Sequence, residues 1–165
     1  MFLDGDVWAA KFRDFRSEAW RLETLPQYLM PQEAEEFAAF KDGARFSGPY
    51  EDSWTQMVRT RNVGRVHIVS RPLSEYLRFE FERYYRHQAP SGEDIRILDI
   101  TERENPLPAA QDFWMFDHST IVLMHYHRDG KQIGRELYEG DPAPFIEYQR
   151  IAKAESVPFL EYVRE

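Results

Sequence analysis

A strand that runs directly into a capped helix is the feature that most constrains this fold. Residues 66–70 form a short apolar run rich in β-branched side chains, which is typical of a buried strand. Pro72 and Ser74 interrupt that run, and apolar residues then recur at helical spacing over residues 73–85. The pattern predicts a strand–helix unit of an α/β sheet, and such sheets commonly bind ligands near this junction.

The other elements are predicted from the same periodicity and from turn residues. Asp6 is placed to cap a first helix, while Pro31 and Pro142 are placed in the first turns of two others. The dipeptide Asp129-Gly130 predicts a hairpin. We predict helices from 6, over 31–41, near 54–62 and from 142, with strands at 19–25, 95–99, 113–116, 120–126 and 133–138.

Length and pattern predict one domain over residues 1–165, without repeats, low-complexity tracts or a long linker. Helices and strands alternate through the first two-thirds of the chain, and consecutive strands with a final helix follow. A hydrophobic content of 42% and an aromatic content of 15% suit a packed core. The predicted fold class is α/β, with a single mixed parallel/antiparallel sheet flanked by helices.

Charge and composition narrow the functional classes. The net charge is −8, from 29 acidic and 21 basic residues, which argues against direct binding of nucleic acid. The absence of cysteine excludes disulfides, thiolate catalysis and thiolate metal sites, and it suits a reducing compartment. Neither a secretory signal nor an apolar stretch of membrane-spanning length is visible. We therefore expect a cytoplasmic protein that does not bind membranes.

Polar and cationic side chains gather where the first strand–helix unit turns. Serine side chains there can cap the helix, and the arginines could bind a phosphate or carboxylate. In the alternative interpretation the helix is simply capped and its arginines pair with helix carboxylates. The candidate ligand-binding residues are Ser70, Arg71, Ser74, Tyr76 and Arg78.

His125 and His127 are the candidate metal ligands. Two residues apart on a strand, their imidazoles would point to one face, and His67 or His118 could add a third ligand. However, two ligands do not make a catalytic metal site, and His127 adjoins the expected turn. We favour a structural pair and predict neither a metal nor another cofactor.

Four carboxylates, at 94, 99, 112 and 117, lie near strand ends, where acid–base residues are often placed. The sequence does not fix any pair of them at a catalytic separation. Neither a nucleophile elbow nor a glycine-rich phosphate loop is present.

Residues 71–80, Arg-Pro-Leu-Ser-Glu-Tyr-Leu-Arg-Phe-Glu, resemble the signature of an uncharacterised actinobacterial protein family. Further stretches are similar to that family, so the resemblance extends over nearly the whole chain. It implies a regulatory setting, because members of the family are often associated with helix-turn-helix regulators. The additional stretches are 12–16, 21–25, 92–98, 112–117 and 124–126.

The order of elements also resembles one half of the phospholipase D fold. Catalytic members of that superfamily carry His-x-Lys just before the strand that corresponds to 113–117. Here Ala110 and Asp112 stand at about those positions. The resemblance therefore implies that this phosphodiester-cleaving mechanism is lost and that a binding domain remains.

We predict a non-catalytic binding or regulatory domain that recognises a small anionic ligand or a protein partner, such as a helix-turn-helix regulator, around residues 70–78. The alternative is a hydrolase or lyase that uses His67, His118 and His125 with Asp99 or Asp117. That alternative requires these side chains to line one cavity. A third hypothesis is an antitoxin-like or scaffold protein that acts through an aromatic surface. The sequence leaves the oligomeric state open.

Overall fold

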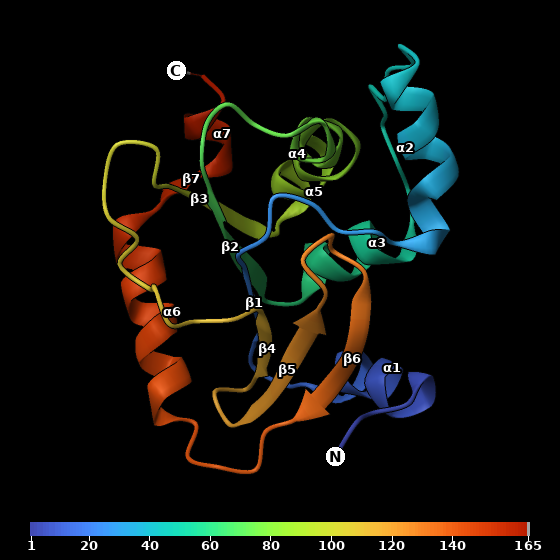
Figure 1. The fold of residues 1–165 in the computed structure, drawn as a ribbon. Helices are drawn as coiled ribbons and strands as arrows, with labels where there is room; N and C mark the ends of the chain where they lie inside the picture. Colours follow the sequence, from blue (N-terminus) through green and yellow to red (C-terminus); the bar gives the residue numbers. More distant parts are fainter. Residues whose placement is uncertain (165) are drawn as a thin grey trace.

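The computed structural model describes residues 1–164 and contains one seven-stranded sheet (Figure 1). The strands are β1 Ala19–Glu23, β2 Val63–Val69, β3 Asp94–Asp99, β4 Phe113–Phe116, β5 Thr120–Tyr126, β6 Gln132–Leu137 and β7 Val157–Pro158. Their order is β6-β5-β4-β1-β2-β3-β7. The three adjacent strands β1, β2 and β3 are parallel, and all other pairings are antiparallel. The predicted single mixed α/β sheet is confirmed.

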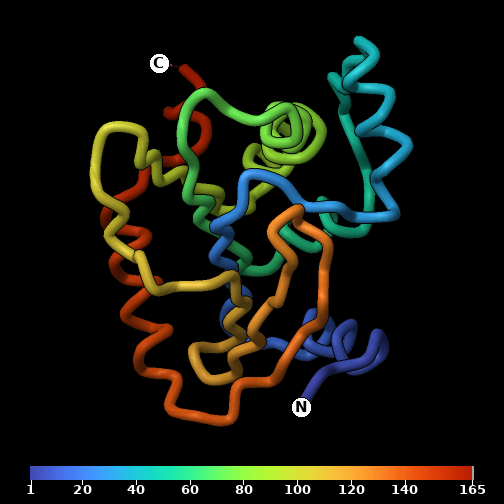
Figure 2. Tube along the Cα trace, in the orientation of Figure 1, coloured from blue at the N-terminus to red at the C-terminus, as the bar shows by residue number. Residues whose placement is uncertain are grey.

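The N-terminal strand β1 occupies the middle of this sheet. It pairs with β2 on one side and with β4 on the other. In Figure 2 the blue segment that contains β1 accordingly runs between later parts of the chain. Residues far apart in the sequence therefore become neighbours around β1.

Helices cover both faces of the sheet. They are α1 Gly5–Asp14, a 3-10 turn at Pro31–Glu33, α2 Ala34–Lys41, α3 Ser53–Thr60, α4 Glu75–Glu80, a π-helical turn at Phe81–Tyr85, α5 Arg86–Ser91, α6 Ala143–Glu155 and α7 Phe159–Tyr162. The segment from α4 through the π turn to α5 is continuous, so the helix predicted at 73–85 starts later and runs further. No helix in the described part of the chain combines the length and the apolar character that crossing a membrane requires.

One face of the sheet carries a large apolar cluster that packs against α6. Trp20 and Leu22 of β1 contribute to this cluster with Phe113 of β4, and α6 supplies Phe145 and Ala152. Figure 1 shows α6 along one side of the sheet, with α1 and α3 on the other side. The alternation of strand side chains directs the even-numbered residues of β1 into this core.

The opposite face carries charged residues between two apolar clusters. Along β2, Val63 belongs to the cluster under α1 and α3, whereas Val69 belongs to the cluster under α2, α4 and α7. Arg65 and His67 lie between these two valines on the same face. A polar stripe therefore crosses the middle of an otherwise apolar layer.

The first helix is capped by Asp4 rather than by the predicted Asp6. The Asp4 carboxylate accepts a 2.9 Å hydrogen bond from the backbone N–H of Val7, and Asp6 lies within the first turn. We expect Asp4→Ala to lower the free energy of unfolding by about 1 kcal/mol, a typical value for a lost N-cap. Asp6→Ala should have a smaller effect, measured by urea denaturation of both variants. A larger loss for Asp6→Ala would contradict this assignment.

Candidate functional site

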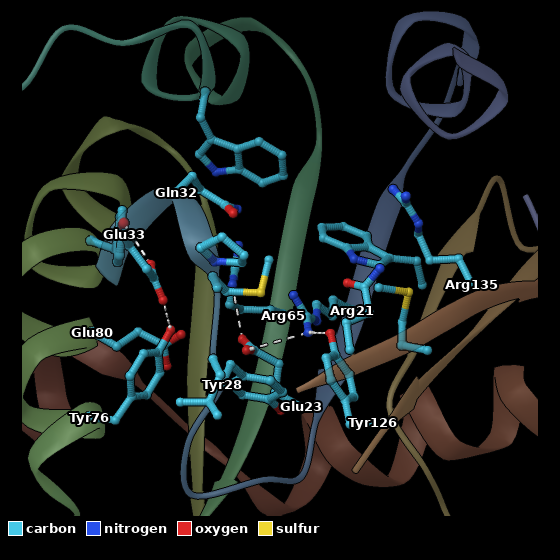
Figure 3. Close-up of a pocket in the computed structure, with 18 of the residues that line it drawn as sticks. Arg21, Glu23, Tyr28, Gln32, Glu33, Arg65, Tyr76, Glu80, Tyr126 and Arg135 are labelled. Carbon is cyan, nitrogen blue, oxygen red and sulfur yellow. Dashed lines mark hydrogen bonds and ion pairs between the residues drawn. The ribbon is translucent and has the colours of Figure 1, made fainter. Parts of the chain in front are cut away.

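A cavity of about 710 Å³ opens over the polar stripe (Figure 3). Arg21, Glu23 and Arg65 form its floor, and Arg135 and Gln32 also line it. Its aromatic lining comprises Trp8, Phe12, Tyr28, Trp54, Tyr76, Tyr84, Tyr85, Trp114 and Tyr126. We call this cavity, with these lining residues, the aromatic cleft.

One half of the floor is centred on Arg65, which is buried between two carboxylates. Its Nη1 donates to Glu23 Oε1 at 2.9 Å, and its Nε donates to Glu93. Trp54 Nε1 donates to the other Glu93 oxygen at 2.7 Å, and the Tyr85 hydroxyl donates to Glu23 at 2.7 Å. Burial opposes ionisation of Glu23, but the surrounding arginine and histidine cations hold its pKa well below its usual range.

The other half of the floor joins Arg21 to Asp112. Arg21 Nη2 donates to the Tyr126 hydroxyl at 2.9 Å and lies 3.6 Å from Asp112 Oδ2. The Tyr28 hydroxyl donates to the same Asp112 oxygen at 2.5 Å, and Thr24 donates to Oδ1 through its backbone and its hydroxyl. Burial raises the pKa of Asp112, and the Arg21 charge offsets part of that rise. This carboxylate is therefore a structural acceptor that fixes β1 against β4.

His67 is fully buried beside the floor and is paired on both ring nitrogens. Nε2 lies 2.8 Å from the Leu25 carbonyl oxygen, and Nδ1 lies 3.0 Å from the Tyr85 hydroxyl and 3.2 Å from Glu80 Oε1. Burial lowers the pKa of the imidazole, but Glu23 and Glu80 outweigh it and raise the pKa to about 9. His67 is thus an imidazolium held between two carboxylates.

The same three residues could in principle hold a metal ion. The ligand atoms of Glu23, His67 and Glu80 lie within 4.8 Å of one another. However, Glu23 Oε1 already accepts hydrogen bonds from Arg65 and Tyr85. A divalent cation would lie beside this guanidinium and would have to displace the imidazole proton. The internal ion pair fits these contacts better than a metal does.

Three buried polar atoms of the cleft lack hydrogen-bond partners within residues 1–164. They are Arg21 Nε, Arg135 Nε and Glu80 Oε1. Glu80 Oε1 still lies 3.2 Å from the charged His67 ring. The guanidinium of Arg135 lies over the Trp8 ring, 5.2 Å from its centroid. The unused hydrogen-bonding capacity of the cleft is therefore mainly that of cationic donors.

The serines and the tyrosine of the predicted junction have separate roles. The Ser74 hydroxyl accepts from the Leu77 N–H at 3.0 Å, which confirms it as the helix cap, while Ser70 is exposed. Tyr76 is buried, and its hydroxyl donates to Glu33 Oε1 at 2.6 Å. Tyr76 therefore belongs to the aromatic cleft and not to a site at the start of the helix.

The two predicted arginines do share a cavity, a second one of about 580 Å³. Arg71 Nε donates to Asp99 Oδ2 at 3.1 Å and to the Tyr162 hydroxyl at 2.8 Å. Arg71 thus pairs with a strand carboxylate instead of the helix carboxylates considered above. Arg78 is exposed at the same cavity.

The proposed histidine pair does not form a joint site. His125 lies on β5, where its Nε2 is 2.9 Å from Glu136 Oε1, but His127 is exposed beyond the end of the strand. The strand register also shifts between His125 and Tyr126, so regular alternation stops before His127.

The histidines of the enzyme hypothesis are not brought into one cavity either. His118 Nε2 lies 3.1 Å from Glu18 Oε1, whereas His67 and His125 have the separate partners given above. Asp117 accepts from the backbone N–H groups of residues 16–18, and Asp99 binds Arg71. Each of these groups is used in a different structural contact.

Sequence reasoning missed the residues that form the cleft floor. The available signal was Arg21-x-Glu23 in one predicted strand and Arg65-x-His67 at the start of another, which was predicted to begin at Val66. Charged residues at alternate strand positions share a face, and helices that cover both faces bury them.

The fold and the cleft together define a mixed α/β domain with an internal pocket of ligand size. Residues 6–164 match the family described as "Domain of unknown function (DUF6879)". The match spans nearly the whole chain, and the protein belongs to this family. A search among curated proteins found no significant match.

Proposed function

We propose that this domain binds a small organic anion with a flat aromatic body in the aromatic cleft, without converting it chemically. The observation that carries the proposal is the pair of buried guanidinium Nε atoms, in Arg21 and Arg135, that lack partners within residues 1–164. Both side chains line the cleft. Buried cationic donors without acceptors are costly, and a ligand carboxylate or phosphate that pairs with the two guanidinium groups would offset part of this cost.

The size and lining of the cleft support a small-molecule ligand. About 710 Å³ lies within the usual range of ligand pockets, which are mostly apolar with a few converging polar groups. Aromatic side chains enclose the floor from α1, from α3 and from the helical segment that runs from α4 to α5, which supplies Tyr76, Tyr84 and Tyr85. Flat aromatic ligands pack well against such rings in stacked or edge-on arrangements.

The carboxylates of the cleft do not oppose an anion as strongly as their number suggests. Glu23 is neutralised by Arg65 and hydrogen-bonded by Tyr85. Glu33 accepts from the Tyr76 and Tyr84 hydroxyls at 2.6 and 2.8 Å, and burial raises its pKa. Glu23 and Glu33 are thus occupied internally, and Glu80 lies beside the charged His67 ring, while the two Nε donors have no partner within residues 1–164.

A regulatory, cytoplasmic setting is part of the proposal and rests on the sequence. The motif resemblance supports a helix-turn-helix protein as the partner, and the lack of cysteine suits a reducing compartment. Ligand binding would then change the affinity for that partner, and co-purification with and without ligand would measure the change.

The binding site can be tested through its own tryptophans. Trp8, Trp54 and Trp114 line the cleft, whereas the fourth tryptophan, Trp20, lies in the core under α6. We expect benzoate to change tryptophan fluorescence with saturation, and uncharged benzamide to bind more weakly. Arg135→Gln should weaken binding of the carboxylate by roughly 10- to 100-fold, the usual value of a charge-assisted hydrogen bond.

Arg150→Gln is the matched control, because Arg150 is exposed on α6 and pairs with Glu147. This variant should bind like the wild type. Equal affinity for benzamide and benzoate, or full binding by Arg135→Gln, would refute the anion site. Circular dichroism of both variants separates lost binding from lost folding.

A further inference from the structure

The second cavity, which we call the arginine cavity, brings together four guanidinium groups. Arg45, Arg71, Arg78 and Arg86 line it, and Glu82 is the one carboxylate among the described residues of its lining. It shares no lining residue with the aromatic cleft. A concentration of cations is unusual in a chain whose net charge is −8.

The helical segment from α4 to α5 places two of these arginines. Arg78, Glu82 and Arg86 are spaced four residues apart and therefore share a side of the segment. This spacing would allow Glu82 to pair with either arginine. Instead Glu82 Oε2 accepts from the Phe46 N–H at 2.8 Å, and neither arginine forms an ion pair with another residue of the described chain.

Arg71 is held in place on the other side of the cavity. Its Nε is shared by Asp99 and the Tyr162 hydroxyl, and its guanidinium carbon lies 4.7 Å from the centre of the Tyr162 ring. Both hydrogen bonds are made by Nε, so they hold only one edge of the guanidinium plane. The terminal amino groups of a guanidinium held in this way remain able to bind an anion.

Apolar side chains complete the cavity. Phe40 and Phe81 line it, and the guanidinium carbon of Arg45 lies over the Phe40 ring, 5.2 Å from its centroid. A ligand with an anionic head and an apolar or aromatic body would match both kinds of wall. Several planar guanidinium groups suit the multiple oxygens of a phosphate.

We infer that the arginine cavity is a second binding site, which takes a small molecule with a phosphate or pyrophosphate group. Arg71 and Arg78 bind the phosphate oxygens with Arg86, and the phenylalanine rings contact the organic body. This site is independent of the ligand proposed for the aromatic cleft, because the two linings are disjoint.

Isothermal titration with pyrophosphate, adenosine 5′-monophosphate and adenosine tests this inference. We expect both phosphates to bind, adenosine not to bind, and Arg78→Gln to weaken phosphate binding by roughly tenfold or more. Arg78 is exposed, so this variant should remain folded. Arg86→Gln should weaken binding in the same way.

Two control variants make the result specific. Arg13→Gln removes an exposed arginine of α1, and Arg135→Gln removes a cation of the aromatic cleft. Both should bind pyrophosphate like the wild type, because pyrophosphate lacks the aromatic body that the cleft is proposed to take. Failure of both phosphates to bind, equal binding of adenosine, or equal weakening by Arg13→Gln would overturn the inference. Weakening of pyrophosphate binding by Arg135→Gln alone would assign phosphate binding to the cleft and would also overturn it.

Discussion

Replacing Arg65 with Met is expected to lower the free energy of unfolding by about 3–5 kcal/mol, the range for breaking one side of a buried ion pair. The guanidinium neutralises Glu23 and Glu93, both of which are almost fully buried. Methionine fills much of the same volume, so the loss of stability would come mainly from buried carboxylates left without a cation and not from a cavity. Urea denaturation monitored by circular dichroism would measure it.

Two further variants show whether charge is the cause. Arg59→Met breaks an exposed ion pair with Glu51 and should leave the denaturation midpoint almost unchanged. Adding Glu93→Gln to Arg65→Met removes one of the stranded carboxylates and should restore part of the lost stability. An Arg65→Met protein as stable as the wild type would show that the floor of the cleft is solvated.

His67 should make stability depend on pH over the neutral to alkaline range. Its pKa is raised from 6.5 to about 9 by Glu23 and Glu80 against the effect of burial, which corresponds to about 3 kcal/mol. The folded pKa lies above the unfolded one, so this contribution is fully present below about pH 6.5. It is lost as the pH rises through about 9.

The difference between wild type and His67→Gln isolates this residue from other titrating groups. We expect the wild-type advantage in unfolding free energy to be large at pH 6 and to shrink as the pH approaches 9.5. Tyr85, which contacts the imidazole, does not titrate in this window, because burial raises its pKa well above 10.0. A wild-type advantage that stays constant from pH 6 to 9.5 would show that His67 is neutral in the folded protein.

The elements of the fold were predictable because their signals are local. Apolar periodicity and turn residues identified the strands at 113–116 and 120–126 with the observed bounds. The short β7 and α7 were not predicted, since two and four residues carry too little periodicity to detect. Strand order follows from long-range packing, which a single sequence does not display.

The site was only partly predictable for the same reason. Arg71 and Arg78 lie close together in sequence, and both line the arginine cavity as their shared junction suggested. The aromatic cleft depends instead on contacts such as Arg21 with Tyr126, which are 105 positions apart. Only the central position of β1 brings these residues together, and that position was not predicted.

The π-helical turn at Phe81–Tyr85 keeps each of two sets of side chains on its own side of the helical segment. In a regular α-helix, each step of four residues rotates about 40° too far, so such a series winds around the axis. A turn with i→i+5 bonds rotates less per residue and offsets this drift. Tyr76, Glu80 and Tyr84 thus reach the aromatic cleft, while Arg78, Glu82 and Arg86 reach the arginine cavity.

The extra residue in this π turn therefore directs the tyrosines to one cavity and the arginines to the other. Deleting a residue there would rotate everything that follows by about 100° and would misdirect the tyrosines and the arginines together. The two cavities have separate linings but share this helical segment, so an insertion or deletion within the segment would change both cavities together.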